Sequence, residues 1–312
     1  MILLAGIPSE SPLAMIREKL DEMGARYVMF NQRSFPVSDI DFEIAGNNIR
    51  GTLRLNGSSY DLEEFTGILT RTMDDQFLPE LRGEPEGSPA RLHARALHEA
   101  LMRWSELSPA RVVNRAAPMG SNFSKPYQLQ LIRKQGFQVP ETLITNDPEL
   151  VLQFKAQHGK LIYKSISGVR SIVSTLDDED LDRLELIRWC PTQFQQFIEG
   201  TNVRVHTVGD EWFATAANTT AIDYRYAGRQ TGEPAELVAV KISDHLAGRC
   251  VGLARALGLA FAGIDLKLTP EGEVYCFEVN PSPAFSYYES NTGQPIAEAV
   301  ARYLAGAEAR PE

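Results

Sequence analysis

Apolar residues follow two different periods along the first 30 positions of the chain. Residues 2–5 and 27–30 are short continuous apolar runs, which are typical of buried strands. Between them, four apolar residues recur at the spacing of a helix: Leu13, Ile16, Leu20 and Met23. Ser11, which a proline follows, is the expected N-cap of this helix, and Gly24 is its expected stop. The pattern therefore predicts that the chain opens as β-α-β.

The next pattern is an antiparallel meander within residues 41–57, in which Ile49, Leu53 and Leu55 share one face. Residues 91–104 then have the apolar spacing of a helix. No Gly-x-Gly-x-x-Gly pattern follows the first strand, so dinucleotide binding by this opening β-α-β unit is weakly supported.

Helices and strands continue to alternate through the rest of the chain. Helices are predicted over residues 126–135, 147–158, 177–188, 243–257 and 295–304. Strands are predicted over residues 161–164, 171–175, 193–198, 202–208 and 212–217. A loop near residue 120 divides the chain, so we expect one domain over residues 1–120 and a second over residues 121–312.

The most informative segment is a hairpin near the end of the chain, predicted from residues 263–268 and 274–280 around a Thr-Pro-Glu-Gly turn. Regular alternation would place four side chains on one face: Val274, Cys276, Glu278 and Asn280. Asp265 and Glu278 are nearly equidistant from the turn, so we expect them to lie opposite each other. Two carboxylates and an amide oxygen suit Mg²⁺. The alternative is a solvated hairpin face with incidental charges.

Composition narrows the class of protein. The 312 residues, 43% of them hydrophobic and 23% charged, are ordinary for a soluble protein of about two domains. A net charge of −10 argues against a general binder of nucleic acid or anionic membranes. Three widely spaced cysteines favour reduced, mostly buried thiols over a disulfide framework or a zinc site. The first apolar run is too short for a signal peptide, and we expect a cytoplasmic protein.

A second candidate site begins at Lys164, which ends an apolar strand and enters a loop of small residues that contains Ser167 and Gly168. Such a loop can fold over phosphates with its exposed N–H groups, and a lysine at its base supplies a positive charge. Many hairpins have turns of this composition, so the loop alone is weak evidence for function.

Taken together, these motifs resemble the ATP-grasp ligases. One pattern in the sequence is similar to the metal-binding end of that fold: Asp265 is followed by Glu278-x-Asn280 and then by Pro281-Ser282-Pro283. The branches that it resembles most are the ribosomal-protein glutamate ligases and the peptide-modifying, graspetide-type ligases. The resemblance implies an α/β protein with a pre-ATP-grasp domain over residues 1–120 and a two-part ATP-grasp domain over residues 121–312.

The resemblance also implies ATP as cofactor, with Mg²⁺ or alternatively Mn²⁺, and a role for each matched residue. The metal ligands would be Asp265, Glu278 and Asn280. The nucleotide would be bound by Lys125, Lys164, Ser167, Gly168, Gln196, Phe197, Ile198, Glu199 and Asn202, with backbone contacts to adenine at Gln196 to Ile198. Asn202 stands where relatives often have an acidic residue near the ribose. Arg204 and Arg225 would contact the transferred phosphoryl group or the substrate.

The activity so implied is ligation: ATP activates a carboxylate as an acyl phosphate, ADP is released, and an amine or a hydroxyl displaces phosphate. A peptide or protein acceptor is favoured by analogy with both branches. A ligase for a small amino acid or metabolite, and a non-catalytic nucleotide-binding regulatory protein, are the alternatives. The N-terminal domain could bind a leader peptide, and a homo-oligomer is compatible with the resemblance.

An aromatic run at residues 285–289 directly follows the expected metal ligands. It could line the acceptor pocket, although aromatic residues at such a position are more often core or dimer contacts.

Overall fold

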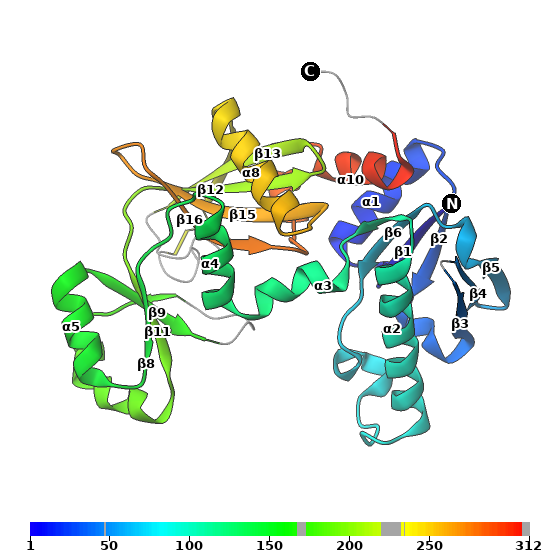
Figure 1. The fold of residues 1–312 in the computed structure, drawn as a ribbon, viewed down its shortest axis with the longest axis horizontal. Coiled ribbons are helices and arrows are strands. Elements are labelled where there is room, and N and C mark those ends of the chain that lie inside the picture. Colours follow the sequence, from blue (N-terminus) through cyan, green and yellow to red (C-terminus); the bar gives the residue numbers. More distant parts are fainter. Residues whose placement is uncertain (47, 167–172, 220–231, 234, 308–312) are drawn as a thin grey trace.

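The computed structural model describes the chain except for residues 47, 167–172, 220–231, 234 and 308–312. An N-terminal α/β unit lies at one end of the molecule and two antiparallel sheets lie at the other (Figure 1). Helix α3 (Ala116–Met119) runs between these two parts. The architecture agrees with the predicted α/β fold class.

The N-terminal unit combines a parallel sheet of order β2-β1-β6-β7 with an antiparallel meander of order β3-β4-β5. Its strands and main helices are β1 (Ile2–Gly6), α1 (Ser11–Glu22), β2 (Tyr27–Asn31), β3 (Ser38–Ala45), β4 (Asn48–Leu55), β5 (Ser58–Asp61), β6 (Gly67–Arg71), α2 (Pro89–Leu107) and β7 (Arg111–Val113). The predicted meander is confirmed, and Ile49, Leu53 and Leu55 pack into one apolar cluster with α2.

Helix α1 departs from its predicted start and from one predicted core position. Its N-cap is Glu10, not Ser11. The Glu10 side chain does not cap the helix because its carboxylate is bound by the Arg71 guanidinium. The predicted core positions Leu13, Ile16 and Leu20 are buried, whereas Met23 is 39% exposed because the helix has ended there.

The second sheet, of order β10-β9-β11-β8, is small and antiparallel. Its elements, with the helices beside it, are β8 (Thr142–Thr145), α5 (Pro148–His158), β9 (Leu161–Ser165), β10 (Ser174–Thr175), α6 (Asp178–Asp182) and β11 (Thr192–Gln196). Helix α4 (Lys125–Lys134) precedes them in the chain and packs against β16 (Val274–Asn280). Asp147 caps α5 through the Glu149 amide, as its Asp-Pro signal predicts. The helix predicted over 177–188 is shorter, since α6 is followed by a 3₁₀ helix.

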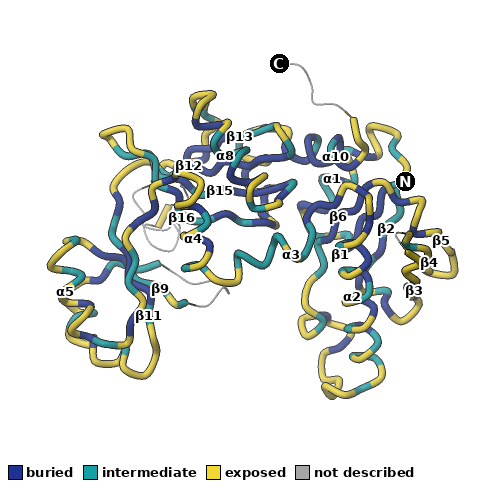
Figure 2. The backbone as a smooth tube through the Cα atoms, viewed as in Figure 1, coloured by how far each residue is buried: buried dark blue, intermediate teal, exposed yellow. Residues whose placement is uncertain are grey.

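The third sheet is antiparallel with the order β14-β13-β12-β15-β16, and its centre is deeply buried (Figure 2). Its elements, with the helices that pack near it, are β12 (Thr201–Val208), β13 (Glu211–Asn218), β14 (Glu236–Val240), α8 (Asp244–Ala256), β15 (Phe261–Leu268), β16 (Val274–Asn280), α9 (Ser286–Thr292) and α10 (Ile296–Ala305). The described 3₁₀ helices are η1 (Gln32–Val37), η2 (Leu62–Glu64), η3 (Asp75–Phe77), η4 (Pro79–Leu81), η5 (Gly120–Phe123) and η6 (Leu184–Trp189).

The C-terminal helix α10 joins the two ends of the chain. It packs against α1, β6 and β7 of the N-terminal unit and also against β12 (Figure 1). One apolar cluster therefore contains Leu4 and Ile16 from the start of the chain together with Phe261 and Val300 from its end. The boundary near residue 120 stays a prediction, but residues on both sides of it share this core.

Two further expectations can be compared with the described residues. Cys250 and Cys276 are buried free thiols, and burial raises the pKa of Cys250 to about 12, whereas Cys190 is exposed. None of the described helices is both long and apolar enough to span a lipid bilayer.

Candidate active site

The hairpin β15–β16 brings the two expected carboxylates together. Asp265 lies directly opposite Glu278 in the strand register, as the distances from the turn predict. A β-bulge then shifts the register, because Leu266 pairs with Cys276 and Phe277 is left as the extra residue.

The bulge makes the predicted face assignment wrong. Cys276 and Val279 both pack into the core although they are three residues apart, and Val274 packs beside them. Glu278 and Asn280 therefore point to the opposite face, which they share with Asp265. A hairpin without the extra residue would have placed either Cys276 or Glu278 on the wrong side.

Arg204 is the cation that accompanies Asp265. The two residues pair across β12 and β15, and the Arg204 Nη1 atom lies 2.7 Å from the Asp265 Oδ2 atom. Asn280 donates from Nδ2 to the same Asp265 oxygen at 3.2 Å. The Arg204 side chain is only 6% exposed, so its charge needs this carboxylate.

Gly263 makes room for the Arg204 side chain. A Cβ atom placed on Gly263 would overlap the Arg204 guanidinium group. The absence of a side chain at this strand position therefore has a packing reason, which is that the guanidinium lies across the backbone of β15.

His206 and Tyr288 complete the surroundings of Arg204. The Arg204 guanidinium carbon lies 5.8 Å from the centre of the Tyr288 ring, and the His206 ring meets Tyr288 edge-on at 4.8 Å. Burial first, and then the positive charge of Arg204, hold the pKa of His206 well below its usual value. His206 is therefore a neutral, fully buried imidazole in the folded protein.

Glu278 is held from the other side by helix α4. Lys125 Nζ lies 3.8 Å from Glu278 Oε1. One turn further along the helix, the buried Gln128 side chain donates to the Val279 carbonyl at 2.8 Å and accepts from the Val279 amide at 3.0 Å. Val279 lies between Glu278 and Asn280, so this amide pair fixes the backbone that carries both expected metal ligands.

The donor set fits a hard divalent cation. Asp265, Glu278 and Asn280 supply two carboxylates and one amide oxygen, which Mg²⁺ accepts together with water and phosphate oxygens. In the described part of the chain, no three His, Cys, Asp or Glu side chains come together as a metal site, and the proposed set combines two carboxylates with an amide. Arg204 and Lys125 meanwhile balance the two carboxylates.

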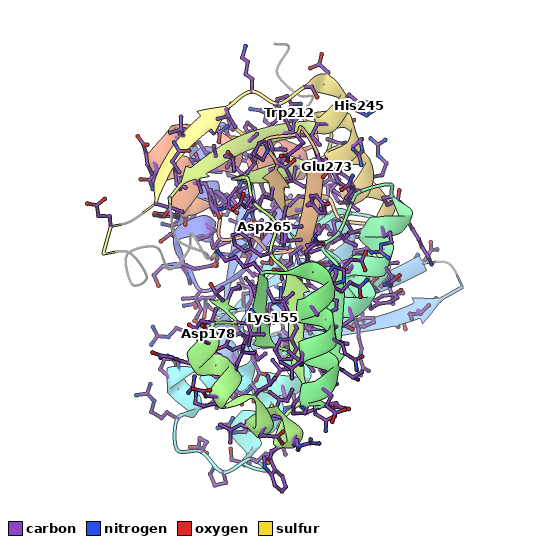
Figure 3. The ribbon with its side chains drawn as sticks, turned by 90° about the vertical axis from the view of Figure 1, so that its left-hand side faces the viewer. Lys155, Asp178, Trp212, His245, Asp265 and Glu273 are labelled. Carbon is purple, nitrogen blue, oxygen red and sulfur yellow. The ribbon has the colours of Figure 1, made fainter. Side chains whose placement is uncertain are left out.

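A cavity of about 510 Å³ opens beside this charged group. Arg204, Asp265 and Asn280 form its polar wall, and the other described lining residues are Ser282, Pro283, Ala284, Tyr287 and Tyr288. Of the aromatic run, Phe285 and Tyr288 are buried core residues, whereas Tyr287 is half exposed on the cavity wall. The run therefore contributes both to the core and to the wall of this cavity. Figure 3 shows Asp265 near the middle of the molecule, between Trp212 above and Lys155 below.

Arg71 joins the N-terminal unit to the rim of this cavity. Its guanidinium group forms an ion pair with Glu10 and donates from Nη1 to the Ser282 hydroxyl at 3.0 Å. The same nitrogen lies 3.4 Å from the Pro283 carbonyl oxygen. Arg71 is 9% exposed and thereby links the start of α1 to the loop that follows Asn280.

Lys164 belongs to the small sheet. It pairs with Gln193 in the register of β9 and β11, and Gln195 pairs with Ile162 on the same face. Within the described residues, no hydrogen-bond partner is found for the buried amide of the Gln193 side chain. Polar groups on this face are consistent with a nucleotide beside Lys164. The predicted residues Ser167, Gly168 and Arg225 lie outside the described residues.

The hinge is the segment from Gln196 to Ile198 at the end of β11, where the resemblance implies backbone contacts to adenine. Some of its backbone hydrogen bonds are already formed within the protein. The Gln196 amide donates to the Glu141 carbonyl at 2.9 Å, and the Phe197 amide donates to the Lys160 carbonyl at 3.0 Å. These two amides are therefore committed to the fold, whereas their carbonyls and the Ile198 backbone are compatible with the expected adenine contacts.

A lysine that sequence reasoning left out lies at the same hinge. Lys267 pairs with Asn202 across β12 and β15, and its ammonium lies 5.3 Å from the centre of the Phe197 ring. Lys160 approaches the same ring at 4.0 Å. Burial, and secondarily Lys160, lower the pKa of Lys267, while the exposed Glu199 opposes the shift. Phe197 thus contacts one cation from β15 and one from the residue that directly precedes β9.

The residues that sequence reasoning missed act through long-range contacts. Gln128, Gly263, His206 and Lys267 carry no motif of their own. Only Gln128 had a usable signal, because it is a polar residue on the buried side of an amphipathic helix one turn after Lys125. The register that brings each of the others to its partner becomes visible only in the folded sheet.

Comparison with known structures first defines the class. The chain superposes on a RiPP-associated ATP-grasp ligase of Chryseobacterium gregarium with a TM-score of 0.83, at 20% identity and covering 99% of this chain and 97% of that one. It also superposes on the ATP-grasp ligase PsnB, which was solved with a minimal precursor, Mg and ADP. The TM-score is 0.78 at 26% identity, and the match covers 98% of this chain and 96% of the PsnB chain. The protein is an ATP-grasp ligase.

The family follows from the sequence match. Residues 124–304 match the RimK-like ATP-grasp domain, and the chain belongs to this family, whose members bind ATP. The probable alpha-L-glutamate ligase of Chromohalobacter salexigens is 25% identical over 215 residues, which cover 66% of this chain and 70% of that protein. These findings confirm the family resemblance inferred from the motifs.

The Gln128 contact gives a prediction about stability. Gln128→Leu should lower the free energy of unfolding by about 2–4 kcal/mol, because two buried backbone groups of Val279 lose their partner. Urea denaturation measures this difference. Gln130→Leu on the exposed side of α4 is the matched control and should change little; equal effects of the two substitutions would contradict the role of Gln128.

The close approach at Gly263 gives a second prediction. Gly263→Ala should destabilise the protein by about 1–3 kcal/mol, since the new methyl group displaces the Arg204 guanidinium. Gly248→Ala in α8 meets open space and should stabilise by up to about 1 kcal/mol through helix propensity. Urea denaturation of both variants checks the contrast, and a neutral Gly263→Ala would show that Arg204 does not need this space.

The lowered pKa of His206 gives a prediction about pH. Only the unfolded chain gains a proton at His206 as the pH falls through its usual value of 6.5, so acid favours unfolding. Between pH 6.5 and pH 5, this residue should remove about 2 kcal/mol of stability. His206→Phe should lessen the loss, whereas His245→Gln, at an exposed position, should not. Urea denaturation at both pH values measures this loss of stability. An equal loss in the wild type and in His206→Phe would contradict the assignment of the effect to His206.

Proposed function

We propose that this ATP-grasp ligase activates a carboxylate on a polypeptide as an acyl phosphate, with release of ADP, and joins it to an amine or a hydroxyl. The observation that carries the proposal is the set of Asp265, Glu278, Asn280 and Arg204 on one face beside a cavity. The likeness to PsnB, solved with a precursor, supports a peptide substrate.

In the first step, an oxygen of the substrate carboxylate attacks the γ-phosphorus of ATP, and the bond from this phosphorus to the bridging oxygen breaks. Mg²⁺ held by Asp265, Glu278 and Asn280 would supply charge neutralisation for the phosphate oxygens. Arg204 stands at the cavity wall and would stabilise the transferred group by its charge. Lys125 and Lys164 would bind the remaining phosphates, and Ile198 and Asn202 would meet the adenine and the ribose.

In the second step, the acceptor nitrogen or oxygen attacks the acyl carbon, phosphate leaves with the bonding electrons, and the acceptor loses a proton. The described residues offer position and charge to this reaction, because no imidazole is among the described residues that line the cavity and His206 is fully buried. We assign Ser167, Gly168 and Arg225 to phosphate or substrate binding from the family pattern alone, and Mn²⁺ as an alternative ion on the chemistry of the ligands.

A second candidate is a ligase for a free amino acid. The probable alpha-L-glutamate ligases, at about a quarter identity over two thirds of the chain, favour this alternative. The two candidates share the first step and differ in the molecule that provides the carboxylate or the acceptor. The assay should therefore supply both kinds of substrate.

Hydroxylamine trapping tests the proposed chemistry. With ATP, Mg²⁺ and hydroxylamine, pools of peptides or amino acids that contain the substrate should yield a hydroxamate together with ADP. Glu278→Gln should lower both by about a hundredfold or more, because a metal ligand and the partner of Lys125 are lost together. Colorimetric detection of hydroxamate and coupled detection of ADP provide the measurement.

The matched control is Glu271→Gln, which removes an exposed carboxylate from the turn of the same hairpin and should leave both rates unchanged. Formation of AMP in place of ADP would rule out the acyl phosphate. ATP binding without turnover in any pool would favour the regulatory alternative.

A further inference from the structure

A second cavity, of about 760 Å³, lies between helix α1, with the residues just before it, and helix α9. Helix α1 and the residues before it contribute Ser9, Ser11, Arg17 and Asp21, among others, and α9 contributes Ser290. Most of its lining residues carry a hydroxyl or a charged group, and Ala14 and Met15 are the apolar exceptions among them. None of the residues to which we assign metal or nucleotide binding lines this cavity.

Tyr287 connects this cavity to the one beside Asp265, because it lines both. Its side chain is 50% exposed, and its ring meets the Tyr288 ring edge-on at 5.9 Å. Tyr288 in turn faces Arg204. An aromatic wall therefore continues from the charged centre into the second cavity.

Arg71 provides a second link between the two cavities, in addition to Tyr287. It binds Glu10, which stands between Ser9 and Ser11 of the second cavity, and it binds Ser282 and Pro283 of the first. The Arg71 side chain is largely buried and its guanidinium binds both rims, which links them to each other. The two cavities are thus neighbours that share Tyr287, and their walls come from both ends of the chain; we refer to the two together as the groove.

We infer that this groove binds an extended segment of a polypeptide substrate, next to the side chain that reacts beside Asp265. The inference rests on the proposed function, and it names the second cavity as a peptide subsite. A free amino acid would need only the first cavity. Hydroxyl groups suit the backbone of an extended chain, and Arg17 together with Glu18 and Asp21 suits a segment with both acidic and basic side chains.

Blocking the second cavity tests the inference by binding. The probe is a fluorescein-labelled random copolymer of glutamate, lysine and tyrosine, and its affinity is measured by fluorescence anisotropy with ADP and Mg²⁺ present. Ser290→Trp fills the groove from the exposed side of α9 and should raise the dissociation constant for the copolymer by about tenfold or more. The control Ser59→Trp, at an exposed serine of β5, should leave it unchanged.

Binding of a fluorescent ATP analogue should be the same in the wild type and in both variants, which shows that the fold is intact. Arg17→Glu provides a second measurement, because reversing the charge of this lining residue should change the affinity for the copolymer without filling the groove. Equal copolymer affinities in all variants, or no copolymer binding to the wild type at millimolar concentration, would overturn the inference.

The hydroxamate assay separates this inference from the proposed function. Hydroxamate from free glutamate, without copolymer binding, would leave a ligase with no peptide groove. Copolymer binding that Ser290→Trp weakens, without ADP formation from any pool, would leave a peptide groove in a protein whose proposed activity fails.

Discussion

The buried charge of Arg204 is the constraint around which the site is arranged. A guanidinium group that is almost fully removed from water is stable only with a carboxylate partner and hydrogen bonds. Asp265 provides that partner directly across the strand pair, and Gly263 leaves the space in which the side chain lies. His206, two residues further along β12, is neutral for the same reason, since a second cation there would be uncompensated.

Side chains that bind backbone groups hold the surrounding segments in place. Gln128 satisfies both backbone groups of Val279, and the buried Asn114 side chain accepts from the Ala260 and Phe261 amides and donates to the Phe261 carbonyl. Asn114 follows β7 of the N-terminal unit, so that unit is bound directly to the start of β15. Together with the packing of α10 against α1, these bonds make the N-terminal unit part of the site's support.

The sequence predicts the structure correctly wherever a local signal determines it. The hairpin register followed from the turn, so Asp265 and Glu278 were correctly paired, and the helix over 148–158 followed from its Asp-Pro start. The bulge at Phe277 was not predictable, because it depends on Cys276 and Val279 both packing into the core. The Glu10 side chain does not cap α1 because it binds Arg71, which lies 61 residues away in the chain. Local patterns do not contain such distant partners.

Charge balance explains how one set of residues can be stable both before and after substrates bind. In the structure, Asp265 faces Arg204 and Glu278 faces Lys125, so two anions and two cations compensate each other. If the two carboxylates held a divalent cation, as we propose, the charges of Arg204 and Lys125 would become available to phosphate oxygens. The nucleotide phosphates and the metal would then restore the balance together, whereas either one alone would leave a net charge in a partly buried site. The site is therefore expected to favour the metal–nucleotide complex over free nucleotide, which is the property that a phosphoryl-transfer centre requires.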